Sequence, residues 1–328
     1  MELIISGYGA KPANTIKGFT LEETGTFREN WKDSLDNPSY VCQGDGCLFT
    51  VTEKENDAAI YLYRQNGQSC QLLDQKRMDG GALCHITYSP KNRALFGACY
   101  GTGTLFSVRV EADHFGDILH QEIQQEGAPL TRVHCVLLNR REDSLIAVNI
   151  ALDSIFLYSV GKGYLTLERI LKAPAGCGPR HALYSEDETK LYVITEYSNE
   201  ILVYDLQDKD RLIQCVSTLS EQFTGKSYCS TLCFSKNNRY LYAANRGAET
   251  IAVFSVSSDG RLSYLEEYDC GGKHPRHMIL SKDGNYLIVC NQNSNQVTSF
   301  LLDTEQGGIL RKLHSMEFMA PSGILERE

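Results

Sequence analysis

Short apolar stretches alternate with polar turns along the whole chain, and this alternation repeats in units of about 47 residues. Each unit opens with two apolar segments around a polar turn, as expected of paired antiparallel strands. Clear copies of the unit cover residues 83–108, 132–158, 179–204, 229–254 and 275–300. Repeats of this length with a strand pattern predict an all-β fold of the propeller type, in which each repeat forms one blade.

The number of blades follows from aligning the first strand of every copy. The aligned positions are Tyr40, His85, His134, His181, Thr231, His277 and Gly323. Residues 321–324 then form a first strand that lacks a second strand, whereas residues 3–8 and 16–21 match a second and a third strand that lack a first. We therefore predict a seven-bladed β-propeller in a single domain, residues 1–328, with one blade closed by N- and C-terminal strands. Pairing the termini also covers edges that could otherwise aggregate.

The distribution of hydrophobic residues agrees with this fold. Residues 191–194 and 241–244 are nearly continuous apolar runs, as expected of strands that are buried on both faces. The chain is 42% hydrophobic, with 18 Tyr and 12 Phe, which is enough to fill the interfaces between blades. No stretch shows a long helical period.

Charge and hydropathy exclude several classes of function. The net charge is -9, and no basic tract is present to neutralise phosphates, so we expect no nucleic-acid partner. No apolar run approaches the roughly 18 residues needed for a membrane span. The first ten residues lack the basic leader and apolar core of a secretory signal. We therefore expect a cytoplasmic protein without membrane contact, and the sequence identifies no protein partner.

The chain contains twelve cysteines but no CxxC pair. Most lie in predicted strands, among them Cys84, Cys99, Cys135, Cys233 and Cys290. The closest spacings, Cys42 to Cys47 and Cys229 to Cys233, match zinc sites poorly, and no histidine pair follows them. We predict buried, reduced thiols, no metal and no cofactor.

Charged residues recur at one end of the predicted propeller. In each repeat the chain turns and returns antiparallel, so residues equidistant from the turn face each other. The facing pairs are Arg180 with Glu196, Ser230 with Arg246, and Arg276 with Gln292. The mouth of the central channel is thus expected to gather His134, Arg180, His181, Glu196, Arg246, Arg276 and His277, with His85 in the equivalent position one blade earlier.

This set of side chains indicates a site for an anionic small molecule. Convergent guanidinium groups bind carboxylate or phosphate through paired hydrogen bonds. A neighbouring histidine and glutamate can move a proton near neutral pH, which is what activating water against an ester requires. The chain lacks the G-x-S-x-G nucleophile motif, which argues against covalent hydrolysis by serine.

A purely structural reading competes for some of these residues. A histidine that recurs at one strand position, as His85 and His277 do, is also typical of a packing or strand-bonding device. Arg180 and Glu196 could form only a cross-strand ion pair. Two arginines have no acid across their own turn, which favours a ligand role for them: Arg246 and Arg276.

These motifs make the chain resemble the seven-bladed propeller lactonase family. The residues that carry the resemblance are Gly178–His181, Leu191–Glu196, Leu241–Arg246, His274–His277 and Ser281–Leu287. The family includes the bacterial propeller type of 6-phosphogluconolactonase and the fungal 3-carboxy-cis,cis-muconate lactonizing enzyme. The resemblance covers essentially the whole chain.

The resemblance implies an active site and a reaction. A His, an Arg, a Glu and a second Arg form the family's proposed catalytic set, which by motif falls on His134, Arg180, Glu196 and Arg246. Arg276 is the alternative for the last role. The remaining members of the constellation would bind substrate: Arg276, His181, His277 and His85. The implied activity is a carboxylic ester hydrolase converting 6-phosphogluconolactone to 6-phosphogluconate, in the pentose phosphate pathway of carbohydrate metabolism.

The sequence departs from the family pattern around His134. The first His of the family's His-x-His is replaced by Arg132, and its Asp-x-Gly-x-Asp reads Asn149 to Asp153. Because one propeller mouth serves both ring opening and ring closure, alternatives stay open. They are a muconate-type isomerase, a propeller that binds protein partners without catalysis, and a calcium-dependent lactonase, for which only Glu196 and Glu53 offer acidic ligands.

Overall fold

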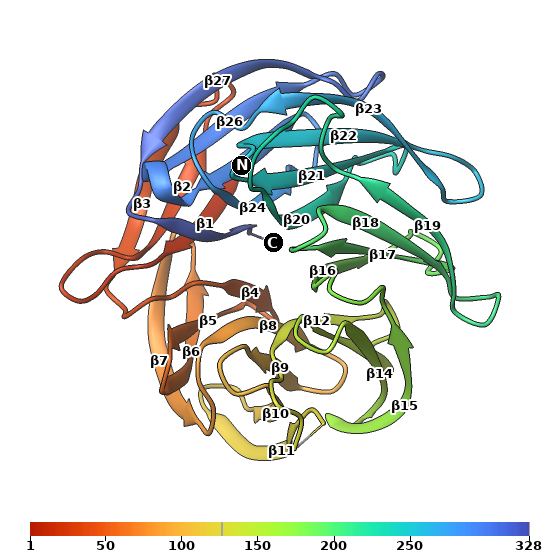
Figure 1. Ribbon diagram of the computed structural model, residues 1–328. Helices are drawn as coiled ribbons and strands as arrows, with labels where there is room; N and C mark the ends of the chain where they lie inside the picture. The colour runs from red at the N-terminus through yellow and green to blue at the C-terminus, as the bar shows by residue number, and fades with distance from the viewer. Residues whose placement is uncertain (126, 328) are drawn as a thin grey trace. The chain divides into compact units, whose positions relative to one another are not determined.

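The protein folds as an all-β propeller of seven four-stranded sheets (Figure 1). The computed structural model describes residues 1–125 and 127–327. Within these residues the one helical element is a short 3₁₀ helix, η1 (Gln292–Ser294). Each sheet corresponds to one predicted repeat, so the prediction of seven blades is confirmed.

The blade shared by the two chain ends, blade 1, is also present. Its strands lie in the order β28 (Pro321–Glu326), β1 (Glu2–Gly7), β2 (Ile16–Leu21) and β3 (Phe27–Asp33). The bounds of β2 coincide with those expected from the sequence. The C-terminal strand therefore supplies the first strand of a blade whose other strands come from the start of the chain.

By its contacts the chain divides into two compact units. The N-terminal unit comprises Glu2–Phe19, Glu29–Ala173 and Arg327, and the C-terminal unit comprises Met1, Thr20–Arg28 and Pro174–Glu326. The assignment of residues 1–328 to a single domain stays a prediction.

The N-terminal unit contains blades 2, 3 and 4. Blade 2 consists of β4 (Val41–Gly44), β5 (Cys47–Lys54), β6 (Asp57–Asn66) and β7 (Ser69–Met78). Blade 3 consists of β8 (Leu83–Ser89), β9 (Ala94–Cys99), β10 (Thr104–Val110) and β11 (Phe115–Ile123). Blade 4 consists of β12 (Val133–Leu138), β13 (Ser144–Asn149), β14 (Ser154–Gly161) and β15 (Tyr164–Lys172).

The C-terminal unit contains blades 5, 6 and 7. Blade 5 consists of β16 (Pro179–Tyr184), β17 (Lys190–Thr195), β18 (Glu200–Asp205) and β19 (Arg211–Ser217). Blade 6 consists of β20 (Tyr228–Phe234), β21 (Tyr240–Arg246), β22 (Thr250–Val256) and β23 (Leu262–Asp269). Blade 7 consists of β24 (Pro275–Leu280), β25 (Tyr286–Asn291), β26 (Gln296–Leu302) and β27 (Ile309–Glu317).

Burial follows the position of a strand within its blade. The second strand β21 is buried along its whole length, and β17 is buried beyond its first residue, as the apolar runs predict. The fourth strand β15 instead exposes most of its side chains. Two-sided burial is expected of an inner strand whose sheet has both faces covered.

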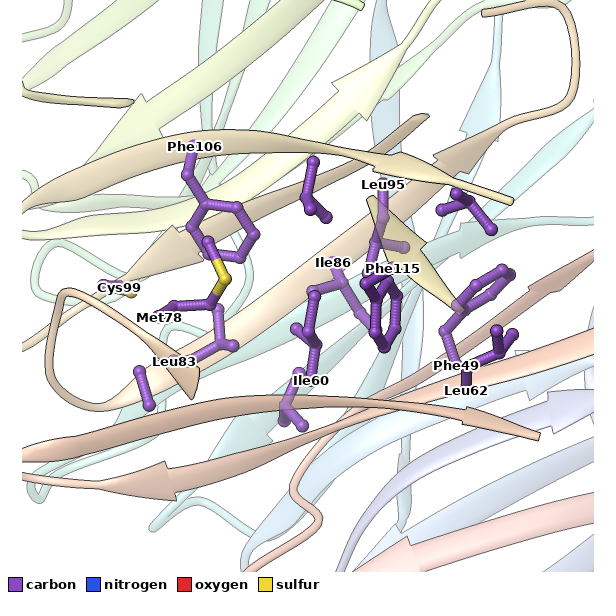
Figure 2. Close-up of a cluster of buried hydrophobic side chains, with 14 residues drawn as sticks. Phe49, Ile60, Leu62, Met78, Leu83, Ile86, Leu95, Cys99, Phe106 and Phe115 are labelled. Carbon is purple, nitrogen blue, oxygen red and sulfur yellow. The ribbon is translucent and has the colours of Figure 1, made fainter. Parts of the chain in front are cut away.

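Apolar side chains from neighbouring blades form the core, as the cluster between blades 2 and 3 shows (Figure 2). Phe49 and Ile60 of blade 2 belong to the same cluster as Leu95 and Phe106 of blade 3. Full burial of side chains of this size stabilises the fold by about 1.5–3 kcal/mol each. Gly97 pairs with Phe106 across β9 and β10, and a Cβ at Gly97 would lie 2.2 Å from the Phe106 ring. The glycine therefore leaves room for the aromatic ring.

All twelve cysteines are free thiols. Seven are buried, four are half-buried and one, Cys215, is exposed. Burial raises the pKa of the Cys99 and Cys229 thiols to about 12, so both stay protonated. The prediction of buried thiols is confirmed for these seven cysteines, and their reduced state in the cell stays a prediction.

The first strand of each of blades 3 to 7 carries a β-bulge near its start, and this corrects the predicted register. In blade 5 the pairing skips from Pro179 to His181, which leaves Arg180 as the extra residue. The same irregularity leaves out one residue in blades 3, 4 and 7, and two in blade 6. The residues left out are Cys84, His134, Ser230 with Thr231, and Arg276.

Two details of the sequence alignment are therefore wrong by one or two residues. His134 stands at the same bulge position as Arg180, whereas Cys135 occupies the place equivalent to His181. The residue opposite Glu196 is Gly178, whose carbonyl accepts the Glu196 N–H at 2.7 Å. Likewise Tyr228 pairs with Arg246, and the His274 carbonyl accepts the Gln292 N–H. A bulge adds a residue without disturbing the apolar pattern, so the pattern does not reveal it.

Candidate active site

Several of the bulged residues lie on adjacent strands of the C-terminal unit. The first strands β16, β20, β24 and β28 contact one another in that order. A bulge redirects its extra side chain relative to the regular strand. Arg180, Ser230 and Arg276 are the bulged residues on three of these strands. Blades 5, 6 and 7 thus present neighbouring side chains from equivalent places.

Glu196 is the centre of the charged cluster. It follows the end of β17, and its Oε2 lies 3.0 Å from Nε of Arg180. The same oxygen lies 2.8 Å from Nη2 of Arg246, which ends β21 in the next blade. The predicted pairing of Arg180 with Glu196 is therefore confirmed at the level of the side chains. The acid that partners Arg246 comes from the neighbouring blade. Pairing residues across the turn of a single repeat could not reveal this contact.

Backbone carbonyls of β20 hold both guanidinium groups in place. Arg180 Nη1 donates to the Ser230 carbonyl. Arg246 Nε donates to the Tyr228 carbonyl at 3.2 Å, and its Nη2 donates to the Cys229 carbonyl at 2.9 Å. Arg180 and Arg246 are only 2% and 6% exposed. Charged groups this deeply buried require opposite charges and hydrogen-bond acceptors close by.

The electrostatics keep Glu196 ionised. Burial acts to raise the pKa of the Glu196 carboxyl, but the charges of Arg180, Arg246 and Arg276 outweigh it. The net result is a pKa below the ordinary value of 4.5. A carboxylate stabilised in this way is a poor base and a strong anchor for the two guanidinium groups.

His181 and His277 also lie in the C-terminal unit, with ring centroids 6.4 Å apart. His277 Nδ1 accepts the backbone N–H of Ile324 at 3.2 Å, which places its proton on Nε2. Burial, together with Arg180 and Arg276, lowers the pKa of His277 to about 3. The imidazole is therefore neutral, and its hydrogen bond ties β24 to β28.

His85 makes an equivalent bond in the N-terminal unit. Its Nδ1 accepts the backbone N–H of Val136 at 3.4 Å, and its ring lies 4.1 Å from the ring of Tyr40. A histidine at this strand position thus receives an amide from the following blade in both units. This strand-bonding role explains the recurrence of His85 and His277, and substrate binding by either stays a prediction.

His134 is buried in the N-terminal unit beside Tyr100, with ring centroids 5.8 Å apart in an edge-on arrangement. Arg132 stacks its guanidinium 4.8 Å from the centroid of the Tyr100 ring and donates from Nη1 to the Tyr100 hydroxyl at 2.9 Å. Arg132, which replaces the family's histidine, therefore holds a neighbour of His134. The convergence of His85 and His134 on the cluster around Glu196 stays a prediction.

The sequence motif His274–His277 contains a residue to which sequence reasoning assigned no role. His274 immediately precedes β24 and adopts a left-handed backbone, with φ at 61°. Its N–H donates to the carboxylate of Glu249. Burial and the charges of Arg246, Arg276 and Arg180 lower the pKa of His274 to about 4, against an opposing effect of Glu196.

Two exposed tyrosines flank the charged cluster. Tyr197 follows Glu196 directly and is 43% exposed. Its ring packs against Gly178, where φ is 65° and an added Cβ would lie 2.4 Å from the ring. Tyr228, whose carbonyl accepts Arg246 Nε, is 42% exposed. Exposed aromatic faces beside buried charges are typical of sites that bind small polar molecules.

The described residues, 1–125 and 127–327, contain no group of three or more His, Cys, Asp or Glu side chains that could hold a metal ion. In the same part of the chain no helix has both the length and the apolar character to cross a membrane.

The chain belongs to the family described as "Lactonase, 7-bladed beta-propeller", whose sequence profile matches residues 2–325. It is 27% identical over 292 residues to the 6-phosphogluconolactonase of Bacillus subtilis (strain 168), covering 83% of this chain and 82% of that protein. It is 28% identical over 233 residues to the 6-phosphogluconolactonase of Klebsiella pneumoniae (strain 342), covering 69% of each. An uncharacterized protein of Lactococcus lactis subsp. cremoris (strain MG1363) is 27% identical over 302 residues, or 88% of this chain and 87% of that protein.

Solved structures share the fold along the whole chain. The periplasmic gluconolactonase of Pseudomonas aeruginosa matches with a TM-score of 0.90 and 24% identity, covering 99% of this chain and 98% of that one. A putative 6-phosphogluconolactonase of Bacteroides fragilis matches with a TM-score of 0.89 and 21% identity, covering 99% and 97%. At this level of identity the likeness establishes the fold.

Proposed function

We propose that this protein hydrolyses an anionic sugar lactone and that 6-phosphogluconolactone is its substrate. The observation that carries the proposal is the pairing of two buried arginines, Arg180 and Arg246, with one glutamate, beside a third arginine, Arg276. Positive charge exceeds negative charge in this cluster, which suits a phosphorylated or carboxylated ligand. The lactonase family and the names of the Bacillus and Klebsiella relatives support the same reaction.

The arginines would serve two steps of the reaction. Arg276 is half-buried and can meet the phosphate of the substrate. Arg180 and Arg246, fixed by Glu196 and by the carbonyls of β20, form a rigid positive environment for the oxyanion that develops on the lactone carbonyl. Prearranged charge of this kind is worth about 10²–10³-fold in rate.

Hydrolysis also needs a base that takes a proton from water. The family pattern offers His134 and Glu196 for this role. Glu196 directs Oε2 at two guanidinium groups and has a lowered pKa, so its basicity is small. A positioned general base contributes about 10²–10⁴-fold, so loss of either effect is measurable.

The proposal is tested by measuring the acid that the purified protein releases from 6-phosphogluconolactone. The assay contains a chelator, and the rate is corrected for spontaneous ring opening. We expect turnover by the wild type and a loss of at least about 10²-fold in Arg180→Lys, which keeps the charge but loses the fixed fork. Folding of the variant is checked by its thermal transition. Absence of turnover by the wild type, or full activity of both Arg180→Lys and Glu196→Gln, contradicts the proposal. Conversion of carboxylated lactones alone would indicate a muconate-type reaction instead.

The cellular setting is part of the proposal. A phosphorylated sugar lactone and free thiols both suit the cytoplasm and the pentose phosphate pathway. The Pseudomonas relative is described as periplasmic. Fractionation of cells that produce the protein without an added leader checks the location, and recovery outside the cytoplasm contradicts it.

A further inference from the structure

The guanidinium of Arg132 is held by a single aromatic side chain of the N-terminal unit. Arg132 lies directly before β12 of blade 4, and Tyr100 lies directly after β9 of blade 3. Nη1 of Arg132 donates to the Tyr100 hydroxyl at 2.9 Å, and Cζ lies 4.8 Å from the centroid of the same ring. The phenol therefore restrains the guanidinium through two different contacts, one to its oxygen and one to its ring.

The backbone of Arg132 is fixed as well. Its backbone N–H donates to Asn149 Oδ1 at 3.1 Å, and its carbonyl accepts the Ile150 N–H at 3.0 Å. Asn149 is fully buried, and its Nδ2 also donates to Thr131 Oγ1 at 2.8 Å. The guanidinium thus extends from a rigid backbone, so little conformational freedom is left to lose when a ligand binds.

The link between Tyr100 and Arg132 has a counterpart in the C-terminal unit. Tyr100 and Glu196 each follow the second strand of a blade, and each donates its N–H to the carbonyl of the residue before the first strand. Each also accepts a guanidinium from the following blade. Arg132 donates to Tyr100, whereas Arg246 pairs with Glu196. The two links differ in the accepting group, which is a neutral phenol in one and a carboxylate in the other.

The charge of Arg132 is therefore not balanced within its surroundings. Both side-chain contacts of Arg132 are to Tyr100, and no Asp or Glu among residues 1–125 and 127–327 forms an ion pair with it. Arg132 is half-buried. Partial burial strengthens the attraction between a guanidinium and an anion, and paired N–H groups match the oxygens of a phosphate or a carboxylate. The position is thus suited to an anionic ligand.

We propose that Arg132 is the centre of an oxyanion-binding site in the N-terminal unit, which accepts a phosphate or a carboxylate group. Tyr100 holds the guanidinium in place, and the side-chain N–H groups that do not contact Tyr100 donate to two oxygens of the anion. The ring of His134 lies 5.8 Å from that of Tyr100, so it is close enough to report on the site. The inference goes beyond the proposed function, because the oxyanion can be a free anion or the phosphate of the lactone.

The binding test uses inorganic phosphate as the probe and the full chain at constant ionic strength. Isothermal titration calorimetry measures the Kd. We expect Arg132→Gln, which keeps a donor for the Tyr100 hydroxyl but has no charge, to weaken phosphate binding at least about tenfold. Tyr100→Phe keeps the ring and removes the hydroxyl, and should weaken binding about threefold. The matched control is Arg141→Gln, which alters an exposed arginine in the turn between β12 and β13 of the same blade and should bind phosphate as the wild type does.

The imidazole resonances of His134 give a second readout, which locates the bound phosphate. Selective labelling of histidine makes them visible by NMR, and His134→Gln assigns them. Phosphate should shift these resonances in the wild type and in Arg141→Gln, and leave them in place in Arg132→Gln. Thermal transitions check that each variant is folded. The inference is overturned if folded Arg132→Gln binds phosphate as tightly as the wild type, or if the wild type binds no phosphate.

Kinetics distinguish the two sources of the oxyanion. If the site takes the phosphate of the lactone, Arg132→Gln should raise KM for 6-phosphogluconolactone about tenfold and leave KM for the same lactone without its phosphate nearly unchanged. If the site takes a free anion, both KM values stay at the wild-type level while the affinity for phosphate still falls. Failure of the wild type to hydrolyse either lactone contradicts the proposed function, and the phosphate titration then still decides the inference.

Discussion

Oε2 of Glu196 lies 2.8 Å from Nη2 of Arg246 although the two residues belong to different blades. Arg180, from the first strand of blade 5, approaches the same oxygen at 3.0 Å. The carboxylate therefore joins one guanidinium of its own blade to one of the next. Since β20 carbonyls bind both guanidinium groups, the pair links the ends of two sheets as well as shaping the site.

We predict that Glu196 and Arg246 are energetically coupled. Removing one partner of a buried pair leaves an uncompensated charge, so Glu196→Gln and Arg246→Met should each lower the free energy of unfolding by about 3–5 kcal/mol. The double variant should lose clearly less than the sum of the two. Urea unfolding of the four proteins measures the coupling. Arg211→Met, which removes an exposed pair with Asp208, is the control and should cost at most about 1 kcal/mol. Additive losses at the buried pair would argue against coupling.

His277 should make stability depend on pH. Its folded pKa of about 3 lies below the ordinary value of 6.5, so the unfolded chain takes up the proton first as pH falls. Stability from this residue is complete above pH 6.5 and is lost as pH falls towards 3. His277→Gln retains an acceptor for the Ile324 N–H but cannot titrate. We expect Tm to fall less steeply between pH 7 and 5 in this variant, and equal slopes would contradict the prediction.

Tyr197 is predicted to contact the substrate through its exposed ring. If a sugar ring stacks on it, Tyr197→Ala should raise KM for 6-phosphogluconolactone up to about tenfold and leave kcat nearly unchanged. Tyr197→Phe should behave like the wild type, because the stacking face is retained. Tyr164→Ala removes an exposed ring from β15, which lies in the other unit, and serves as the control. A KM unaffected in Tyr197→Ala would place the substrate elsewhere.

Gly97 should be intolerant of any side chain. A Cβ at this position would lie 2.2 Å from the ring of Phe106, so Gly97→Ala forces that ring out of the core. We expect a loss of about 1–3 kcal/mol in the free energy of unfolding. Gly161, at the end of β14, has no heavy atom within 4 Å of an added Cβ. Gly161→Ala should therefore change stability by less than about 0.5 kcal/mol, and a similar cost for both would contradict the packing argument.

The fold could be predicted because every repeat contains buried inner strands, whose apolar residues are visible in the sequence. Inner strands such as β17 and β21 are apolar on both faces, so each copy is visible in the sequence, including the incomplete copy divided between β28 and β1. The register could not be predicted to the residue. A bulge changes which side chain faces its partner strand but not the number of apolar residues. The apolar pattern therefore does not show that His134 is the extra residue of its strand.

The site was predictable in its residue types and only partly in its contacts. Arg180 and Glu196 meet because they lie near the same end of one hairpin. Arg246 of blade 6 contacts Glu196 of the adjacent blade 5. Such a contact depends on how neighbouring sheets pack, and the pattern within one repeat carries no information about that packing.

The repeated bulge has a consequence for how this scaffold can acquire new chemistry. In blades 3 to 7 the extra residue of the first strand lies outside the regular pairing, so changing its side chain leaves the strand hydrogen bonds in place. In this chain the position holds sulfur in blade 3, an imidazole in blade 4, guanidinium groups in blades 5 and 7, and a hydroxyl in blade 6. A single substitution at a bulge position can therefore change the chemical group that a blade presents and leave the strand pairing of the propeller unchanged.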